Sequence, residues 1–259
     1  MEEPAKRAKP GKIHTVLTSV KALGLGMVIV TILLRIVEKI YNRLKKLANR
    51  IKSHDPFDQK YGTDTAGELQ IKDTNVPDSK TKSGAQLYWA TPERIDRYLL
   101  NSLDIEYPQY TFIDFGSGKG RVLLVASSYP FQQIIGVEFV PELHEIAQNN
   151  IKLFKSPGQK CRSISSSCMD ATQFTLPETP LVLHFYHPFK SQSDLLAQVI
   201  GRIDQSLKEK PRSVWIIYVH HVDDAVGETF SQFSSLRKHK DIKLVDAYWN
   251  TTIYTNNTN

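Results

Sequence analysis

The residues whose types and spacing could do chemistry begin with three alternating glycines that follow an acid, in the segment Asp114-Phe115-Gly116-Ser117-Gly118-Lys119-Gly120. An apolar run precedes this segment, and apolar residues at helical spacing follow it, so the pattern predicts a strand, a tight turn and a helix. Glycines let the backbone approach a ligand without a Cβ in the way, and the first N–H groups of the helix point at the same place. The segment therefore predicts a nucleotide-binding turn.

The spacing of the glycines decides which nucleotide this turn suits. A dinucleotide fingerprint, Gly-x-Gly-x-x-Gly, would place its third glycine where Arg121 stands, but that glycine falls one residue earlier, at Gly120. A phosphate-binding loop would need a glycine at Ile113 and a serine or threonine in place of Gly120. Both alternatives are disfavoured.

Two further acids follow at the ends of the next two predicted strands. The apolar residues 134–137 lead to Glu138, about 20 residues beyond the glycines, where a carboxylate can accept the hydroxyls of a ribose. A weaker strand from Cys161 to Cys168 leads into Met169 and Asp170. Three acids at three successive strand ends are much harder to obtain by chance than one.

These motifs resemble those of the class I S-adenosylmethionine-dependent methyltransferases, over roughly residues 85–256. The resemblance implies that Glu138 binds the ribose, that Met169 packs on the adenine and that Asp170 binds its amino group. It implies that the cofactor is S-adenosylmethionine and that the following residues bind it: Asp114, Gly116, Ser117, Gly118, Gly120, Glu138, Met169 and Asp170. Lys119 and Arg121 are expected to point outward or to cap the helix.

The acceptor side is less well defined. The strand over 180–186 ends at His187-Pro188-Phe189, where amine methyltransferases of this fold often have Asn or Asp, two prolines and an aromatic residue. The departure leaves amine specificity open, and His187 and Tyr186 become candidates for acid–base work or orientation. The segment from Phe57 to Gly67 resembles one found ahead of the core in bacterial members with unassigned substrates. It predicts an active-site lid in which Tyr61 and Asp64 are substrate-side candidates.

The elements that must position these residues form an α/β fold. We expect a doubly wound, seven-stranded Rossmann-like sheet in a methyltransferase domain over 86–259, with an N-terminal apolar and amphipathic helical extension over 1–52 and a linker over 53–85. Thr91 as N-cap and Pro92 at the first helical position predict a helix over about 92–102. The later elements are expected to be helices at 191–209 and 223–239 and strands at 213–220, 242–248 and 251–255, with Trp249-Asn250 joining the last two.

The basic charge of the chain belongs to its N-terminal part. Residues 1–52 carry a net charge of +9 and residues 53–259 a net charge of −3, out of +6 for the whole chain, so no specific nucleic-acid partner is expected. Residues 16–34 are almost wholly apolar and would form about 28 Å of helix, and residues 35–52 read as a basic amphipathic helix. The pattern predicts a membrane-anchored protein, single-pass or peripheral, whose catalytic domain is cytoplasmic. A buried or solvated helix is the alternative.

No metal site is predicted. Cys161 and Cys168 fit neither a zinc pair nor a disulfide framework, and both are expected to be buried in a reducing compartment. Histidines 184, 187, 220 and 221 gather at neighbouring strand ends, but no carboxylate or thiolate has fitting spacing.

The sequence therefore predicts methyl transfer to an unidentified acceptor. The acceptor is a protein or a small molecule: an amine such as a protein lysine, a compound near the membrane, or a quinone-like hydroxyl. The alternatives are a non-catalytic membrane-attached scaffold that retains the fold, which has no need of the cofactor acids, and another nucleotide-dependent enzyme, which the glycine spacing disfavours.

Overall fold

The computed structural model describes residues 30, 33–37, 55–76, 79–190, 193–244 and 248–257. The chain divides into two compact units, Met1–Ser53 and His54–Asn259. In the first unit, residues 30 and 33–37 are helical and their side chains are exposed. The predicted membrane helix over 16–34 and amphipathic helix over 35–52 lie largely outside the described residues. Among the residues that are described, no helix has the length and apolar character needed to cross a membrane.

The second unit is built on a seven-stranded sheet with the strand order β5-β4-β3-β6-β7-β9-β8. The first five strands in this order are parallel, and β9 runs antiparallel to both β7 and β8. The strands are β3 Thr111–Phe115, β4 Gln133–Glu138, β5 Ile164–Cys168, β6 Leu181–Tyr186, β7 Val214–His221, β8 Arg237–Lys243 and β9 Trp249–Thr255. The predicted doubly wound, seven-stranded, Rossmann-like α/β sheet is confirmed.

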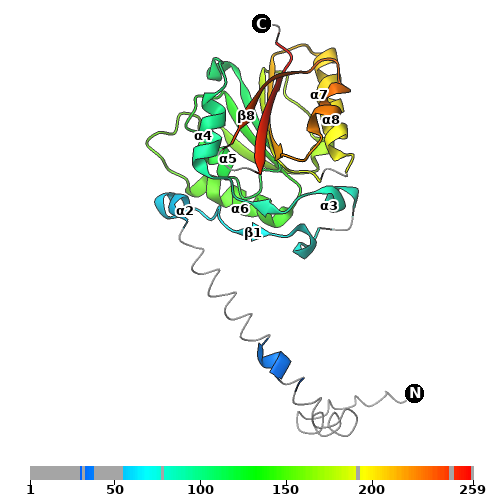
Figure 1. Ribbon diagram of the computed structural model, residues 1–259. Helices are drawn as coiled ribbons and strands as arrows, with labels where there is room; N and C mark the ends of the chain where they lie inside the picture. Colours follow the sequence, from blue (N-terminus) through cyan, green and yellow to red (C-terminus); the bar gives the residue numbers. More distant parts are fainter. Residues whose placement is uncertain are drawn as a thin grey trace, which may run out of the picture. The chain divides into compact units, whose positions relative to one another are not determined.

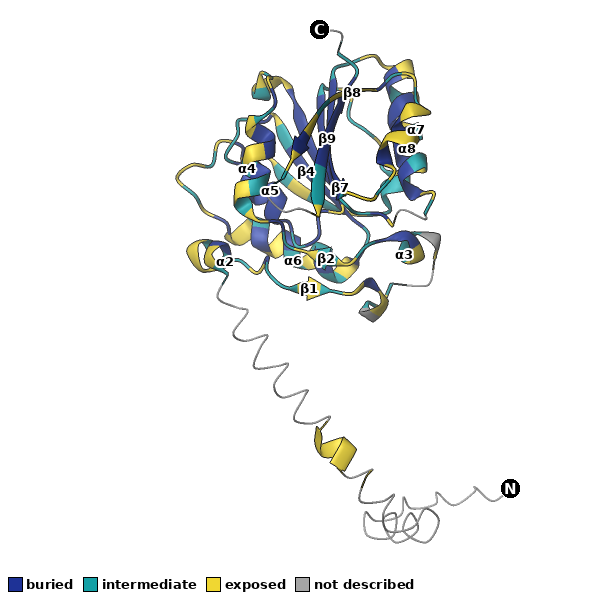
Figure 2. Cartoon of the chain, in the orientation of Figure 1, coloured by how far each residue is buried: buried dark blue, intermediate teal, exposed yellow. Residues whose placement is uncertain are grey.

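Helices cover both faces of this sheet (Figure 1). Alternate residues of a strand point to opposite faces, and the core divides accordingly. Ile216 and Tyr218 of β7 pack with α7 and α8 on one face, whereas Trp215 and Ile217 pack with α4 and α5 on the other. The helices are α4 Glu93–Asn101, α5 Arg121–Ala126, α6 Pro141–Leu153, α7 Leu195–Glu209 and α8 Val226–Ser231. Figure 2 shows the buried strands between these layers.

The predicted linker over 53–85 has regular structure of its own. It contains α2 Pro56–Tyr61, β1 Glu68–Leu69 and α3 Lys80–Gly84, and β1 pairs antiparallel with β2 Tyr88–Trp89. Asp55 caps α2 by accepting the N–H groups of Phe57 and Asp58. The segment also meets the core, because Ala85 forms an isolated bridge with Phe189 and the N–H of Gln86 donates to the carbonyl of Pro188. Short 3₁₀ helices occur at Ile71–Asp73, Tyr107–Gln109 and Ala171–Gln173.

Several predicted boundaries are wrong. Within the helix predicted at 223–239, only the six residues of α8 are α-helical. The last residues of the predicted helix belong to β8, an edge strand whose exposed basic residues have the pattern of a polar surface. Strand β9 begins at Trp249, so Trp249-Asn250 lie inside a strand and do not form the turn. In α4, Pro92 and not Thr91 is the N-cap, and its φ of −64° with ψ of 126° is extended. Cys161 is buried as expected, but Cys168 is exposed.

Candidate functional site

The glycine turn follows β3, which lies between β4 and β6 in the sheet. Gly116, Gly118 and Gly120 have φ angles of 80°, 53° and 85°, in the left-handed region that side chains disfavour. A Cβ on Gly118 would lie 2.2 Å from the Tyr88 ring, and one on Gly116 would lie 3.0 Å from Cβ of Pro188. The turn therefore requires glycine both for its backbone angles and for the close approach of its neighbours.

Glu138 ends β4, the strand next to β3, and touches the glycine turn. Its Oε2 accepts the N–H of Gly118 at 2.8 Å and its Oε1 accepts the N–H of Val140 at 2.8 Å. The side chain is buried, and burial raises the pKa of Glu138 to about 7, against the backbone hydrogen bonds that lower it. The carboxyl group of Glu138 is thus held beside the turn, with a pKa close to neutral pH.

Met169 and Asp170 follow β5, the next strand. Met169 and Ala171 line the cavity beside the turn, but Asp170 is not among the lining residues. The Asp170 carboxylate accepts the hydroxyls of Thr81 and Thr172 and the N–H of Thr172. Burial would raise the pKa of Asp170, but these hydrogen bonds hold it below its usual value. These contacts hold the Asp170 side chain against Thr81 of α3, and Asp170 does not line the cavity.

Asp114 is buried at the end of β3 and pairs with a histidine. Its Oδ1 lies 2.8 Å from Nδ1 of His184 on β6, and both side chains are at most 3% exposed. Burial lowers the pKa of His184, but the hydrogen bond and charge of Asp114 outweigh it and raise the pKa overall. A second buried acid, Asp96 of α4, has no hydrogen-bond partner among the described residues for either oxygen, and burial raises its pKa to about 7.

A cavity of about 960 Å³ opens along this edge of the sheet. By the strand order we divide its lining into two ends: the glycine turn with the ends of β4 and β5, and the segment after β6 with the β8–β9 region, to which we add β2 and α4. The residues of the first end include Asp114, Gly116, Ser117, Glu138, Phe139, Leu143 and Met169; those of the second include Trp89, Arg94, Tyr98, Tyr186, His187, Lys243, Leu244 and Trp249. The volume falls at the upper end of the range usual for small-molecule sites.

His187 lies in this cavity and forms a pair with an acid. Its Nε2 is 2.9 Å from Oδ2 of Asp224, and its ring centroid is 5.2 Å from that of Trp249. Its φ of 45° makes it the one non-glycine residue with positive φ among those described, a strained backbone of the kind that gathers at functional sites. Burial lowers the pKa of His187, although Asp224 opposes the shift. The pair resembles a base with its orienting acid.

The other two acceptor-side candidates lie elsewhere. Tyr61 packs on Phe57 and Phe154, with ring centroids 4.8 and 4.7 Å away, and Asp64 pairs with Nζ of Lys119 at 2.8 Å. Neither residue lines the cavity, whereas Tyr186 does. The structure therefore does not bring Tyr61 and Asp64 together with His187 and Tyr186 in the cavity lining, and their substrate-side role stays a prediction.

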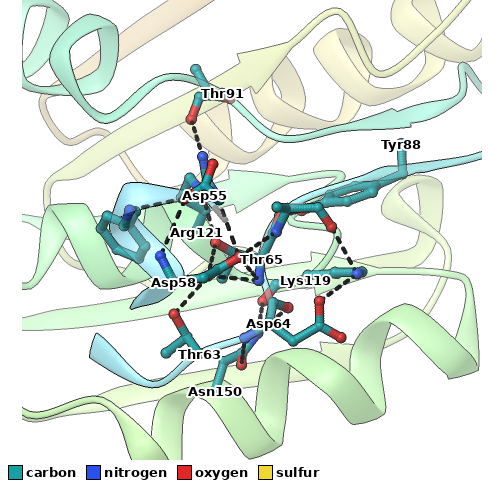
Figure 3. Close-up of polar contacts among 12 residues, drawn as sticks. Asp55, Asp58, Thr63, Asp64, Thr65, Tyr88, Thr91, Lys119, Arg121 and Asn150 are labelled. Carbon is teal, nitrogen blue, oxygen red and sulfur yellow. Dashed lines mark hydrogen bonds and ion pairs between the residues drawn. The ribbon is translucent and has the colours of Figure 1, made fainter. Parts of the chain in front are cut away.

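Arg121 forms the centre of a buried polar cluster, contrary to the expectation that it points outward (Figure 3). Its Nη2 lies 2.9 Å from Oδ1 of Asp55 and 3.7 Å from Oδ2 of Asp58, and its Nε donates to Oγ1 of Thr65 at 2.7 Å. Nη1 donates to the carbonyl of Thr91 at 3.4 Å. The first residue of α5 thus joins the cavity wall to the segment that contains α2.

Two more residues, Lys119 and Asn150, fasten the same segment to the glycine turn. Lys119 donates to Oδ1 of Asp64 and to the carbonyl of Ala66, at 2.8 and 2.9 Å. Asn150 of α6 donates to the carbonyls of Asp64 and Lys119 and accepts the N–H of Asp64. Lys119 therefore does not simply point outward, and the predicted lid is anchored at several points.

The histidines do not form a metal centre in the described part of the chain. His184 pairs with Asp114, His187 with Asp224, and Nε2 of His220 with the hydroxyl of Thr252. No group of three or more potential ligands was found among the described residues. Asp224 was missed by the sequence interpretation, since it belongs to no motif; its one signal is an acid placed shortly after a strand that ends in two histidines.

Comparison with known proteins gives structural likenesses only. No protein-family model matches the sequence. No curated protein matches it either. Among solved structures, the chain is similar to an RNA methyltransferase from Salinibacter ruber in complex with S-adenosyl-L-homocysteine, at 17% identity and a TM-score of 0.44, covering 64% of this chain and 92% of that one. It is also similar to the ribosomal protein L11 methylase from Lactobacillus delbrueckii subsp. bulgaricus, at 13% identity and a TM-score of 0.45, covering 62% and 75%. Likeness at this level carries no functional information, so function rests on the residues of the site.

Proposed function

We propose that this protein transfers a methyl group from S-adenosylmethionine to an acceptor that loses a proton during the reaction. The observation that carries the proposal is the arrangement of three neighbouring strand ends at one edge of the sheet. The glycine turn after β3, Glu138 at the end of β4 and Met169 after β5 line the same cavity. In open α/β sheets, ligands bind outside the carboxyl ends of the strands, which is where these residues lie.

The residues present fit this cofactor. Oγ of Ser117 is buried in the cavity wall without a hydrogen-bond partner among the described residues, so a polar ligand atom could complete it. Glu138 offers carboxylate oxygens for a ribose, and Phe139, Leu143 and Met169 offer apolar surface for an adenine. The bound cofactor would supply an electrophilic methyl group on a sulfonium.

The role of the chain itself is to position and deprotonate the acceptor. His187 at the other end of the cavity would take the acceptor's proton on a ring nitrogen, and Asp224 would orient the ring and stabilise the imidazolium. Burial lowers the pKa of His187, which favours the neutral ring that is able to accept a proton. Tyr186 would contact the acceptor from the same strand end.

Calorimetric titration of the full-length protein with S-adenosylmethionine tests the proposal. We expect binding in the micromolar range, and a loss of at least about tenfold in Glu138→Ala because its carboxylate would hold the ribose. Glu145→Ala is the matched control, since Glu145 is an exposed acid of α6. Absence of binding at millimolar cofactor would favour the scaffold alternative, and unchanged binding in Glu138→Ala would remove that residue from the site.

We also propose that residues 16–52 attach the protein to the cytoplasmic face of a membrane. The support is the sequence pattern alone: an apolar stretch at 16–34 followed by seven basic residues over 35–52. Fractionation of cells that express the full chain is the test. Recovery of the protein in the soluble fraction at physiological salt would contradict the proposal.

A further inference from the structure

We propose that the acceptor is an aromatic or similarly planar hydroxyl compound that carries an anionic group. This inference rests on the proposed methyl transfer and names the substrate class of the same cavity. It follows from the residues at the end of the cavity that holds His187. Their apolar surface, their charge and the nature of the base each restrict the acceptor.

The first restriction is apolar surface left in contact with solvent. Trp89, Tyr98 and Leu87 line the cavity and are nevertheless 64%, 56% and 38% exposed. Large apolar side chains that stay exposed around a cavity mark surface that a ligand covers. Trp249 also lines the cavity, and its ring centroid lies 5.6 Å from that of Tyr186 and 5.2 Å from that of His187. Aromatic walls of this kind suit a planar, apolar body.

The second restriction is the sign of the charge. Two acids, Asp114 and Glu138, occur among the described lining residues, and both belong to the glycine-turn end. The acceptor end instead has Arg94 and Lys243, whose side chains are exposed. Neither side chain has an ion pair or hydrogen bond with any residue in the described ranges. Two exposed basic groups without an ion pair in the described ranges favour an anionic ligand.

The third restriction comes from the base. Asp224, the acid nearest to His187, is engaged with it at 2.9 Å and is only 12% exposed. A lysine or other amine would arrive as a cation, with no free carboxylate among the described lining residues at this end to receive it and with Arg94 and Lys243 to repel it. A hydroxyl is neutral before it reacts and needs only to pass its proton to His187 as the O–CH₃ bond forms and the S–CH₃ bond breaks.

A polynucleotide would also combine aromatic surface with anions. It presents many phosphates, however, and binding it requires a broad basic surface. Residues 53–259 carry a net charge of −3, and the acceptor end offers two exposed basic side chains among the lining residues. A compact anion therefore fits better.

Three phenols that differ in charge test this inference: 4-hydroxyphenylacetate, 4-ethylphenol and tyramine. Each is titrated by calorimetry into the full-length protein saturated with S-adenosylhomocysteine. We expect the anion to bind about five- to tenfold more tightly than the neutral phenol and the cation to bind most weakly. Incubation with S-adenosylmethionine should convert the anion to its methyl ether.

Variants identify the residues responsible. Arg94→Gln and Lys243→Gln should each weaken binding of the anion about three- to tenfold and leave 4-ethylphenol unchanged. Lys155→Gln, an exposed lysine outside the cavity lining, is the matched control. Failure of S-adenosylhomocysteine to bind would contradict the proposed function itself. If it binds, three results overturn the acceptor class: tyramine binding at least as tightly as the anion, no binding of any of the phenols, or tighter binding of a uridine 15-mer that Arg94→Gln weakens.

Discussion

Replacing Arg121 by methionine should destabilise the protein strongly. The Arg121 side chain is 7% exposed, and its guanidinium lies 2.9 Å from the Asp55 carboxylate and 3.7 Å from that of Asp58. Removing one partner of a buried ion pair costs about 3–5 kcal/mol because a charge stays buried without compensation. Asp58 keeps its hydrogen bonds from Thr63, Thr65 and Ala66 after the change, so we expect the lower end, about 3 kcal/mol.

Urea unfolding of the full-length protein, followed by tryptophan fluorescence, measures this loss. With a slope of about 2–3 kcal/mol per molar, the midpoint should fall by about 1–1.5 M. Arg202→Met, which removes an exposed arginine of α7, should change stability by less than about 0.5 kcal/mol. Arg121→Lys keeps the charge but loses the planar fork and should fall between the two.

A second change separates the charge from the packing. If unpaired carboxylates cause the loss, Asp55→Asn in the Arg121→Met background should recover part of it, although the same substitution alone should destabilise. The reasoning fails if Arg121→Met unfolds at the same urea concentration as Arg202→Met. It also fails if Asp55→Asn is equally destabilising in both backgrounds, since the two side chains would then be uncoupled.

Three further predictions follow from the site. Burial raises the pKa of Glu138 to about 7, and ribose hydroxyls would bind the ionised carboxylate. Cofactor affinity measured by calorimetry should therefore fall as the pH drops from 8 to 6, and Glu138→Gln should abolish this pH dependence. Burial raises the pKa of Asp96 from 3.8 to about 7, so this carboxyl group reduces the stability of the fold progressively as the pH rises from about 4 to 7. Asp96→Asn should therefore raise the urea midpoint at pH 8 but not at pH 4, and an equal change at both pH values would contradict this. Asp224→Asn should lower turnover about 10²-fold or more with a cofactor Kd within twofold of wild type, whereas unchanged turnover would show that His187 acts without it.

The glycine turn could be predicted from sequence because its requirements are local. Positive φ at Gly116, Gly118 and Gly120 is a property of single residues at fixed spacing, and the strand and helix around them are continuous in sequence. The placement of Glu138 and Met169 also followed, since parallel strands end at one edge of the sheet. The exposed edge strand β8 could not be predicted from the sequence. Its residues are mostly basic, with one buried side chain, Ile242, and they show no alternation of apolar and polar residues.

Arg121 and Asp224 show the opposite case, in which the partner is distant in sequence. The carboxylates around Arg121 precede it by 63 and 66 residues, and nothing in the periodicity of α5 distinguishes a buried arginine from an exposed one. Asp224 reaches His187 only because β7 lies beside β6. A charged residue at the start of a helix is exposed in most proteins, so sequence reasoning favours the wrong placement wherever an ion pair is buried.

The two ends of the cavity therefore depend on different kinds of information. The cofactor end is a short motif whose backbone does much of the work, and few substitutions in it are compatible with the φ angles and close contacts at Gly116 and Gly118. The acceptor end is formed by side chains of Trp89, α4, β8 and β9. The backbone of these elements does not depend on the identity of those side chains. Substitutions at Arg94 or Lys243 can consequently change which acceptor binds while the fold and the cofactor site remain intact. The glycine turn and the acid beside it support the proposed methyl donor, whereas the acceptor has to be inferred from the charge and shape of the opposite wall.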